Sequence, residues 1–279
     1  MGPQLGISTD NWRLENKSLR FCVGRVAELG SKWIEFDVIT GLDFFEGQQF
    51  SPSVSLESDP YVLKDLIDEH GLRCSCLSAH WPIWSYQCID YMIKAIRFAR
   101  VLGCSAIATT DSEHIPDTYS LDEWMGVYKY HFDCVVPSAE RHGVYVCVEP
   151  HGVLTQRPDS LLRIVTQTRS PMMGVNFDTG NTFIAGHNPP DFLRQVIDHV
   201  HHMHIKEVSH ELAAALRGES TGIAASSAAI GEGANAEGIR QCVRMLKEHG
   251  KNVVCSLEVS GDAPTERSVP WFRRVLEEA

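Results

Sequence analysis

Four residues able to bind a metal ion or to move a proton stand at the ends of short apolar runs: Glu149, Asp178, His204 and Glu258. Each run holds about five residues such as Val, Ile, Phe, Met and Cys, which is typical of a strand buried on both faces. A polar side chain at the carboxyl end of such a strand lies at the edge of the core. Two Glu, one Asp and one His in this setting indicate a metal site.

The spacing of these residues indicates that they belong to successive strands. Glu149 and Asp178 are 29 residues apart (178 − 149), and Asp178 and His204 are 26 apart (204 − 178), which suits one strand and one helix each. His204 and Glu258 are 54 apart (258 − 204), which suits one such unit plus an insertion. The insertion is the stretch 209–233, whose many Ala, Ser and Gly residues favour a mobile loop over a pocket.

The rest of the chain repeats the alternation of a buried strand and an amphipathic helix, eight times in all. Several helical patterns end at a glycine, as at Gly30, Gly71 and Gly103, which is a common helix stop. The predicted strands are residues 5–9, 32–37, 73–79, 105–110, 144–148, 173–177, 200–208 and 252–257. The predicted helices are residues 19–29, 61–70, 89–102, 121–142, 159–168, 190–200, 236–249 and 269–278, and a loop is predicted over 41–60.

This alternation, without a Pro- or Ser-rich linker, predicts one α/β domain over residues 1–279, a (β/α)8 TIM barrel. An open doubly wound sheet is the alternative. Against it, residues 8–11 (Ser-Thr-Asp-Asn) stand where that fold would carry a glycine-rich phosphate-binding turn. In a barrel the carboxyl ends of all strands meet at one rim, so the four polar residues are predicted to converge there.

The composition is that of an ordinary globular protein and narrows the choice of partner. Of the 279 residues, 43% are hydrophobic and 22% are charged, which argues against a disordered or fibrous chain. The formal net charge of −11 argues against a nucleic-acid partner, because phosphate binding needs Lys and Arg, and suits a small carbohydrate. No stretch is typical of a signal peptide or a membrane span, so we expect a cytoplasmic protein that binds no membrane. We expect its nine cysteines to be reduced.

Three carboxylates on one small buried rim cannot all be anions without a cation, because like charges in a low dielectric force protonation. A divalent ion resolves this conflict. Each residue alone could instead cap a helix or form a salt bridge, and it is the set that predicts one metal ion. An oxygen-rich set with one imidazole suits Mn, with Mg, Co or Zn as alternatives, and it leaves positions open for substrate oxygens.

At these residues the chain resembles the sugar phosphate isomerase/epimerase superfamily, the xylose isomerase-like barrels. These include ketose 3-epimerases, inosose dehydratase, keto-glycoside epimerases and, more distantly, endonuclease IV. The resemblance extends over essentially the whole chain, and its more specific motifs are Glu149-Pro150-His151, Phe177-Asp178-Thr179-Gly180-Asn181, His204-Ile205-Lys206-Glu207 and Gly231-Glu232-Gly233. The metal ligands of the family match, one by one, Glu149, Asp178, His204 and Glu258.

The resemblance implies an epimerase or isomerase that acts on a keto sugar or a 3-keto-glycoside. The metal would chelate a carbonyl and a neighbouring hydroxyl and would acidify the adjacent C–H, so that an enediolate forms. Glu149 and Glu258, on either side of the ligand ring, would be the catalytic bases that remove a proton from one face and return one to the other. Their order depends on the stereochemistry of the substrate and is left open.

A second group of residues is predicted to bind the substrate. His151 and Lys206 each stand two residues beyond a ligand, on the same side of an extended segment. Asn181 takes the position at which ketose 3-epimerases carry a substrate-binding histidine, which counts against 3-epimerisation of a free ketose. The others are His80 and Asp111 at strand ends, Arg217 in the insertion, and Trp12 and Trp81, whose rings would stack on a sugar or an aglycone. For each of them an ordinary structural role is the alternative.

Three other functions stay open. The same site could expel a β-oxygen substituent, which would make the protein a lyase, a dehydratase or a 3-keto-glycoside-cleaving enzyme. An endonuclease IV-like repair enzyme would need a His-rich multi-zinc site and a basic face, and a sugar-binding barrel without catalysis would need no base. The sequence also leaves open the sugar, the stereocentre and whether the chain forms a homo-oligomer.

Overall fold

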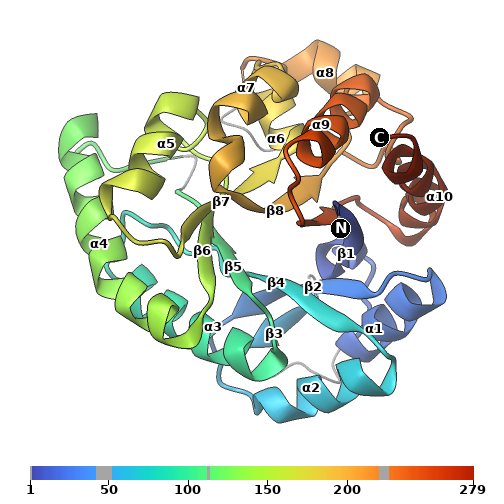
Figure 1. Cartoon of the computed structure of the whole chain (residues 1–279), viewed down its shortest axis with the longest axis horizontal. Coiled ribbons are helices and arrows are strands. Elements are labelled where there is room, and N and C mark those ends of the chain that lie inside the picture. The colour runs from blue at the N-terminus through green and yellow to red at the C-terminus, as the bar shows by residue number, and fades with distance from the viewer. Residues whose placement is uncertain (1, 42–51, 112–113, 220–225) are drawn as a thin grey trace.

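The computed structural model describes residues 2–41, 52–111, 114–219 and 226–279. Within these residues the centre is a closed barrel of eight parallel strands, as predicted (Figure 1). The strands lie in the order β1-β9-β8-β7-β6-β5-β4-β2, and β1 pairs with β2 to close the ring. Their bounds are β1 (Gln4–Ser8), β2 (Trp33–Ile39), β4 (Arg73–Ser78), β5 (Ala106–Thr109), β6 (Tyr145–Val148), β7 (Met173–Asp178), β8 (Val200–Ile205) and β9 (Val254–Leu257).

Helices surround the barrel, and Figure 1 shows the chain running once around it from the blue N-terminus to the red C-terminus. The first and last helices are neighbours, since Arg25 and Asp262 form an ion pair (Nε–Oδ1 2.8 Å). The predicted helices correspond to α1 (Leu19–Glu28), α2 (Pro60–Glu69), α3 (Gln87–Leu102), α4 (Leu121–His142), α5 (Pro158–Gln167), α7 (Pro189–Val196), α9 (Ala236–Glu248) and α10 (Asp262–Glu278). The 3-10 helices η1 (Thr9–Trp12) and η2 (Ile197–His199) lie at strand ends.

Local chemistry explains where the helices begin and end. In α4 the Ser120 hydroxyl accepts from the Glu123 N–H (3.3 Å), and the Glu123 carboxylate accepts from the Ser120 N–H (2.8 Å). This reciprocal cap satisfies backbone donors that the first helical turn leaves without partners. The helix ends at Gly143, whose φ of 65° is a left-handed conformation that favours glycine.

Three connections differ from the sequence prediction. β3 (Ser53–Ser55) lies in the predicted loop 41–60 and pairs in parallel with β2, while residues 42–51 of that loop lie outside the described residues. The strand is too short for its pattern of residues to be informative. α6 (Thr179–Ile184) forms directly after β7, because the Asp178 carboxylate caps it by accepting from the Asn181 N–H (2.7 Å). α8 (His210–Leu216) forms within the predicted insertion, of which residues 220–225 are not among the described ones.

The start of α10 was also predicted wrongly, at Val269 instead of Asp262. The apolar periodicity begins only near Val269, whereas the first turns bury small polar residues. The hydroxyls of Thr265 and Ser268 each donate to the backbone carbonyl four residues earlier (both 2.7 Å), which allows their burial.

The apolar core is one large continuous cluster, with fully buried rings such as Phe36, Phe132, Phe177 and Phe272. All nine cysteines are free thiols, and all except Cys134 are buried. Burial raises the pKa of the Cys255 thiol to about 12, which keeps it a neutral core residue. Among the described residues, no helix is both long and apolar enough to cross a membrane.

Candidate metal centre

Four neighbouring strands bring Glu149, Asp178, His204 and Glu258 to the carboxyl-terminal rim of the barrel. Glu149 and Glu258 directly follow β6 and β9, while Asp178 and His204 belong to the last residues of β7 and β8. Asp178 lies opposite His204 in the paired strands, and the Glu258 N–H donates to the carbonyl of Ile205 (3.0 Å). The side chains are therefore anchored by the sheet itself, which holds them more rigidly than a loop would.

The imidazole of His204 is where the carboxylates meet. Its Nδ1 lies 3.1 Å from Glu258 Oε2 and 3.4 Å from Glu149 Oε2. Asp178 Oδ2 lies 3.8 Å from the same nitrogen. One ligand-type atom each of Glu149, Asp178 and His204 lies within 4.8 Å of the others. These three residues are buried and Glu258 is partly exposed, so the cluster is open to the rim on the Glu258 side.

The donor set fits a divalent cation. Asp178 Oδ2 and Glu258 Oε2 are buried and accept no hydrogen bond from the part of the chain that the structure describes. Burial raises the pKa of Asp178 more than the charge of Lys206 lowers it. An anionic carboxylate in this position is thus unfavourable without a further positive charge, and carboxylate oxygens beside an imidazole nitrogen suit Mn, Mg, Co or Zn.

Lys206 carries positive charge into the same cluster. Its Nζ lies 2.7 Å from Glu258 Oε1 and 3.4 Å from Asp178 Oδ2. Burial would lower the pKa of the Lys206 ammonium, but the carboxylates of Asp178 and Glu258 raise it above its ordinary value. A Cβ at residue 180 would lie 2.6 Å from the Lys206 Cγ, so Gly180 is what lets the side chain pass the start of α6.

At both glutamates of the cluster, neighbouring positive charge lowers the pKa more than burial raises it. Burial would raise the pKa of Glu149, but the neighbouring His204 holds it well below its usual range. Burial would likewise raise the pKa of Glu258, but Lys206 and His204 hold it below its usual range. In turn, burial would lower the pKa of His204, and the surrounding carboxylates raise it well above its usual value. Both glutamates are therefore anionic near neutral pH and able to accept a proton.

Two amide side chains and two histidines surround Glu149. Asn176 Nδ2 donates to Oε2 (2.9 Å), and Asn181 Nδ2 donates to Oε1 (2.8 Å). His80 Nε2 lies 3.3 Å from Oε2, and the ring of His151 stacks on that of His80 at 6.1 Å. Burial lowers the pKa of His151 to about 4, so its ring is neutral. Three residues predicted to bind substrate thus lie beside one of the predicted bases.

Asp111, also predicted to bind substrate, has a structural contact instead. Its carboxylate accepts from the Leu154 N–H (2.6 Å) and from the hydroxyl of Thr155. The side chain is buried, and these bonds hold the loop that follows β6 and carries His151. This placement argues against direct contact with a sugar, because the oxygens are already occupied by the loop.

Replacing Asp111 by alanine is expected to lower the free energy of unfolding by about 1–3 kcal/mol, because buried backbone donors of the loop lose their acceptor. Urea denaturation followed by circular dichroism measures the change. Asp117→Ala, at an exposed position further along the chain, is the control and should have almost no effect. Equal stability of the two variants would contradict this role of Asp111.

Trp12 and Arg217 also lie in contacts that differ from the prediction. Trp12 has no exposed surface, and its Nε1–H donates to Asp262 Oδ1 (3.0 Å), which argues against its stacking on a sugar. Arg217 is exposed, donates to the carbonyl of Phe183 (3.2 Å), and lies over the Phe183 ring at 4.4 Å. Its guanidinium therefore connects the end of α8 to α6. The place of Arg217 in the predicted insertion did not indicate these contacts.

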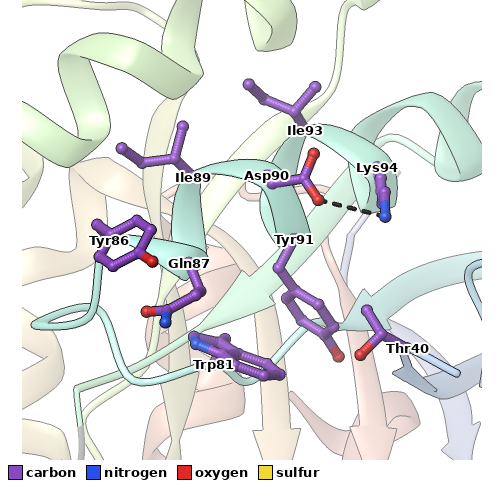
Figure 2. Close-up of a pocket in the computed structure, with 9 residues that line it drawn as sticks. All are labelled: Thr40, Trp81, Tyr86, Gln87, Ile89, Asp90, Tyr91, Ile93 and Lys94. Atoms are coloured by element: carbon purple, nitrogen blue, oxygen red, sulfur yellow. Dashed lines mark ion pairs between the residues drawn. The ribbon is translucent and has the colours of Figure 1, made fainter.

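Trp81 lines a cavity of about 590 Å³ together with the first turns of α3. Figure 2 shows its indole beside the ring of Tyr91, and the ring centroids are 5.2 Å apart. Tyr86 and Gln87 stand above the indole, and Thr40 closes the side near β2. Because Trp81 follows His80, this aromatic wall begins one residue from the histidine that contacts Glu149, and the predicted role of Trp81 as a stacking surface stays a prediction.

The motif Gly231-Glu232-Gly233 closes the insertion against the rim. The Glu207 carboxylate accepts from the N–H groups of Gly231 (3.0 Å) and Asn235 (2.8 Å). A Cβ at Gly233 would lie 2.3 Å from the carbonyl oxygen of Val208, so only glycine permits this approach. Glu207 therefore organises the return of the chain to α9. The structural alternative for Lys206 was a salt bridge to Glu207 or to Asp178, and the structure shows the ion pair with Asp178 (3.4 Å).

Three buried polar residues below the rim were missed by the sequence prediction: Glu35, Asn176 and His202. Glu35 Oε1 lies 2.9 Å from His204 Nε2, and His202 Nδ1 lies 3.0 Å from Asn176 Oδ1. A signal for Glu35 was present in the sequence. It stands between Ile34 and Phe36 in a strand expected to be buried on both faces, and a charged residue there must be paired.

The sequence matches a family model, the xylose isomerase-like TIM barrel, over residues 23–275. No curated protein matches it. A D-tagatose 3-epimerase-like protein is similar in structure, with 20% identity, a TM-score of 0.75 and coverage of 99% of this chain and 97% of that chain. The 3-keto-D-glucoside 4-epimerase from E. coli shows 15% identity and a TM-score of 0.69 (98% and 99% covered). The probable 3-DHS dehydratase from Bacillus anthracis shows 16% identity and a TM-score of 0.70 (97% and 98% covered).

Proposed function

Since the chain belongs to the xylose isomerase-like TIM barrel family, we propose that it is a divalent-metal-dependent epimerase or isomerase of a keto sugar or 3-keto-glycoside. One observation carries the proposal: the carboxylates of Glu149 and Glu258 lie 3.4 and 3.1 Å from the same nitrogen of His204 at the rim of the barrel. Such a pair can exchange protons with a substrate held between them. The epimerases among the similar structures support the same reaction class.

The metal would be held by Glu149, Asp178, His204 and Glu258. The buried oxygens of Asp178 and Glu258 without hydrogen-bond partners in the described chain support this assignment. When bound, a divalent ion would supply Lewis acidity to a ketone oxygen and so acidify the neighbouring C–H. Mn is the expected ion because the set is rich in oxygen, and Mg, Co and Zn are the alternatives.

The residues of the chain would perform the proton transfers. Glu149 is held in place by the neutral amides of Asn176 and Asn181, which orient its carboxylate without cancelling its charge. It can therefore accept the proton from the carbon next to the ketone. Glu258, which is anionic in the free protein, would take a proton from water and pass it to the other face, while Glu149 would release its proton to water. Lys206, beside Glu258, would donate a hydrogen bond to the substrate oxygen on which negative charge develops.

A lyase or dehydratase using the same residues is the second candidate. A proton removed beside a ketone can be followed by loss of a β-oxygen substituent instead of reprotonation. The similar structure of a probable dehydratase favours this alternative, as does the cavity beside Trp81, which could receive a leaving aglycone. The two reactions share the proton abstraction and differ only in their second step.

Incubation of the Mn-loaded protein with 3-keto-glucosides in deuterated water tests the proposal. Epimerisation places deuterium on a carbon next to the ketone of an intact epimer, which NMR spectroscopy and mass spectrometry detect. Release of the aglycone would instead support the lyase. Protein stripped of metal by a chelator is the control, and absence of both products from metal-loaded protein across a range of keto sugars would contradict the proposed function.

A further inference from the structure

Glu35 reaches across the interior of the barrel to His204. It projects from β2, which is separated from β8 by β1 and β9 in the ring of strands. Its Oε1 lies 2.9 Å from His204 Nε2, and the exposed fractions of Glu35 and His204 are 0% and 2%. The contact is thus a fully buried hydrogen bond on the side of the imidazole opposite to the metal cluster.

This hydrogen bond determines which nitrogen of His204 is available as a ligand. A carboxylate accepts hydrogen bonds and donates none, so the Nε2 that faces Glu35 must carry the hydrogen. A metal ion that binds His204 must therefore take the place of the hydrogen on the other nitrogen, Nδ1. Nδ1 is the nitrogen that faces Glu149, Asp178 and Glu258. The opposite tautomer would set a lone pair of His204 against the Glu35 carboxylate.

Two polar neighbours lie beside the Glu35 carboxylate. The Ser78 hydroxyl donates to Glu35 Oε1 (2.8 Å), and His202 Nε2 lies 3.6 Å from Oε2. The Ser78 hydroxyl and His204 Nε2 are both directed at Glu35 Oε1, and two donors at one buried oxygen favour the ionised carboxylate. A charge, a fixed position and a single orientation toward Nε2 are what a residue that orients a metal ligand requires.

The same buried layer also reaches Glu149. His202 Nδ1 donates to Asn176 Oδ1 (3.0 Å), and Asn176 Nδ2 donates to Glu149 Oε2 (2.9 Å). The two partners fix the orientation of the Asn176 amide. His202 Nε2 accepts from the Ser256 hydroxyl (3.2 Å). One connected network below the rim therefore contacts both His204 and Glu149.

We propose that Glu35 is a positioning residue that fixes the tautomer and the ring orientation of His204, so that Nδ1 binds the metal. The inference rests on the proposed function in taking His204 as a ligand. The alternative is a second metal site, because ligand-type atoms of Glu35, His202 and His204 also lie within 4.8 Å of one another. We favour the positioning role, because His204 Nε2 cannot donate to Glu35 and bind a metal at once.

The test compares Mn²⁺ binding by wild-type protein, Glu35→Gln and Ser78→Ala, using calorimetry. Glu35→Gln removes the charge with almost no change of shape, and we expect its Kd for Mn²⁺ to rise by about 10–100-fold. Ser78→Ala is the matched control, because it removes another hydrogen bond to the same Glu35 oxygen and leaves the contact with His204. Its Kd should stay within about threefold of that of the wild type, well below the effect expected of Glu35→Gln.

A second measurement needs no variant. Nitrogen NMR of the histidine side chains in wild-type protein loaded with diamagnetic Zn²⁺ should find the hydrogen of His204 on Nε2. A hydrogen on Nδ1, an unchanged Kd in folded Glu35→Gln, or two bound ions of which this variant loses one would each overturn the inference. A wild-type protein that binds no divalent ion would instead contradict the proposed function itself.

Discussion

Replacing Glu149 by glutamine is expected to lower the turnover of a keto-sugar substrate by about 10²–10⁴-fold, the range that general base catalysis supplies. The amide has the shape of the carboxylate and cannot accept the proton. Glu149 is an anion in the folded protein, because neighbouring His204 holds its pKa well below the usual range. The loss should therefore appear in kcat at neutral pH and above.

Metal binding must be kept separate from proton transfer in this experiment. Both oxygens of Glu149 accept hydrogen bonds from amide NH2 groups, of Asn176 and of Asn181. In Glu149→Gln the new NH2 group would face the NH2 group of either Asn176 or Asn181, and only one oxygen would remain. The side chain therefore also becomes a poorer metal ligand. Rates are accordingly compared at saturating Mn²⁺ with measured occupancy. Glu248→Gln, exposed at the end of α9, is the control and should behave like the wild type.

Isotope exchange distinguishes the two proposed bases. In deuterated water, the variant that lacks the base which removes the proton should show neither exchange nor inversion. The variant that lacks the other one should still exchange the substrate hydrogen while inversion is lost. Comparing Glu149→Gln with Glu258→Gln on one substrate therefore also gives their order. Wild-type turnover in both variants would contradict the two-base mechanism.

The barrel and the convergence of the four rim residues could be predicted because each lies at the end of an apolar strand. The spacings of Glu149, Asp178 and His204 each suit one strand and one helix, and the spacing from His204 to Glu258 suits one such unit plus an insertion. In a parallel barrel, such spacing is enough to place the ends of the strands on one rim. At these rim positions the sequence pattern and the geometry of the barrel lead to the same prediction.

Contacts across the barrel interior could not be predicted in this way. Glu35 and His204 are 169 residues apart and come from strands that are not neighbours, so neither spacing nor strand pairing relates them. The sequence also does not indicate which loop residues are exposed and which are buried. Trp12 occupies a position after a strand, where stacking on a substrate was expected, and only the packed structure places it inside the core. Short elements such as α6 depend on a single cap, Asp178.

The second large effect is expected from Lys206→Met, which should lower the free energy of unfolding of the metal-free protein by about 3–5 kcal/mol. The substitution removes the ammonium that lies 2.7 Å from Glu258 and 3.4 Å from Asp178, and leaves their charges uncompensated. Chemical denaturation in the presence of a chelator measures the loss. Lys94→Met is the matched control. Its ammonium pairs with Asp90 and Glu57 on the surface, where such pairs contribute less than about 1 kcal/mol.

The comparison becomes more informative when it is repeated with Mn²⁺. A divalent ion held by Asp178 and Glu258 would supply positive charge to the carboxylates that Lys206 neutralises, so Mn²⁺ should offset part of the loss. The rise in Tm on addition of Mn²⁺ should then be larger for Lys206→Met than for the wild type, because ligand binding stabilises only the folded protein. An equal rise in Tm for the wild type and both lysine variants would place the ion away from Lys206, and would contradict the assignment of Asp178 and Glu258 as ligands.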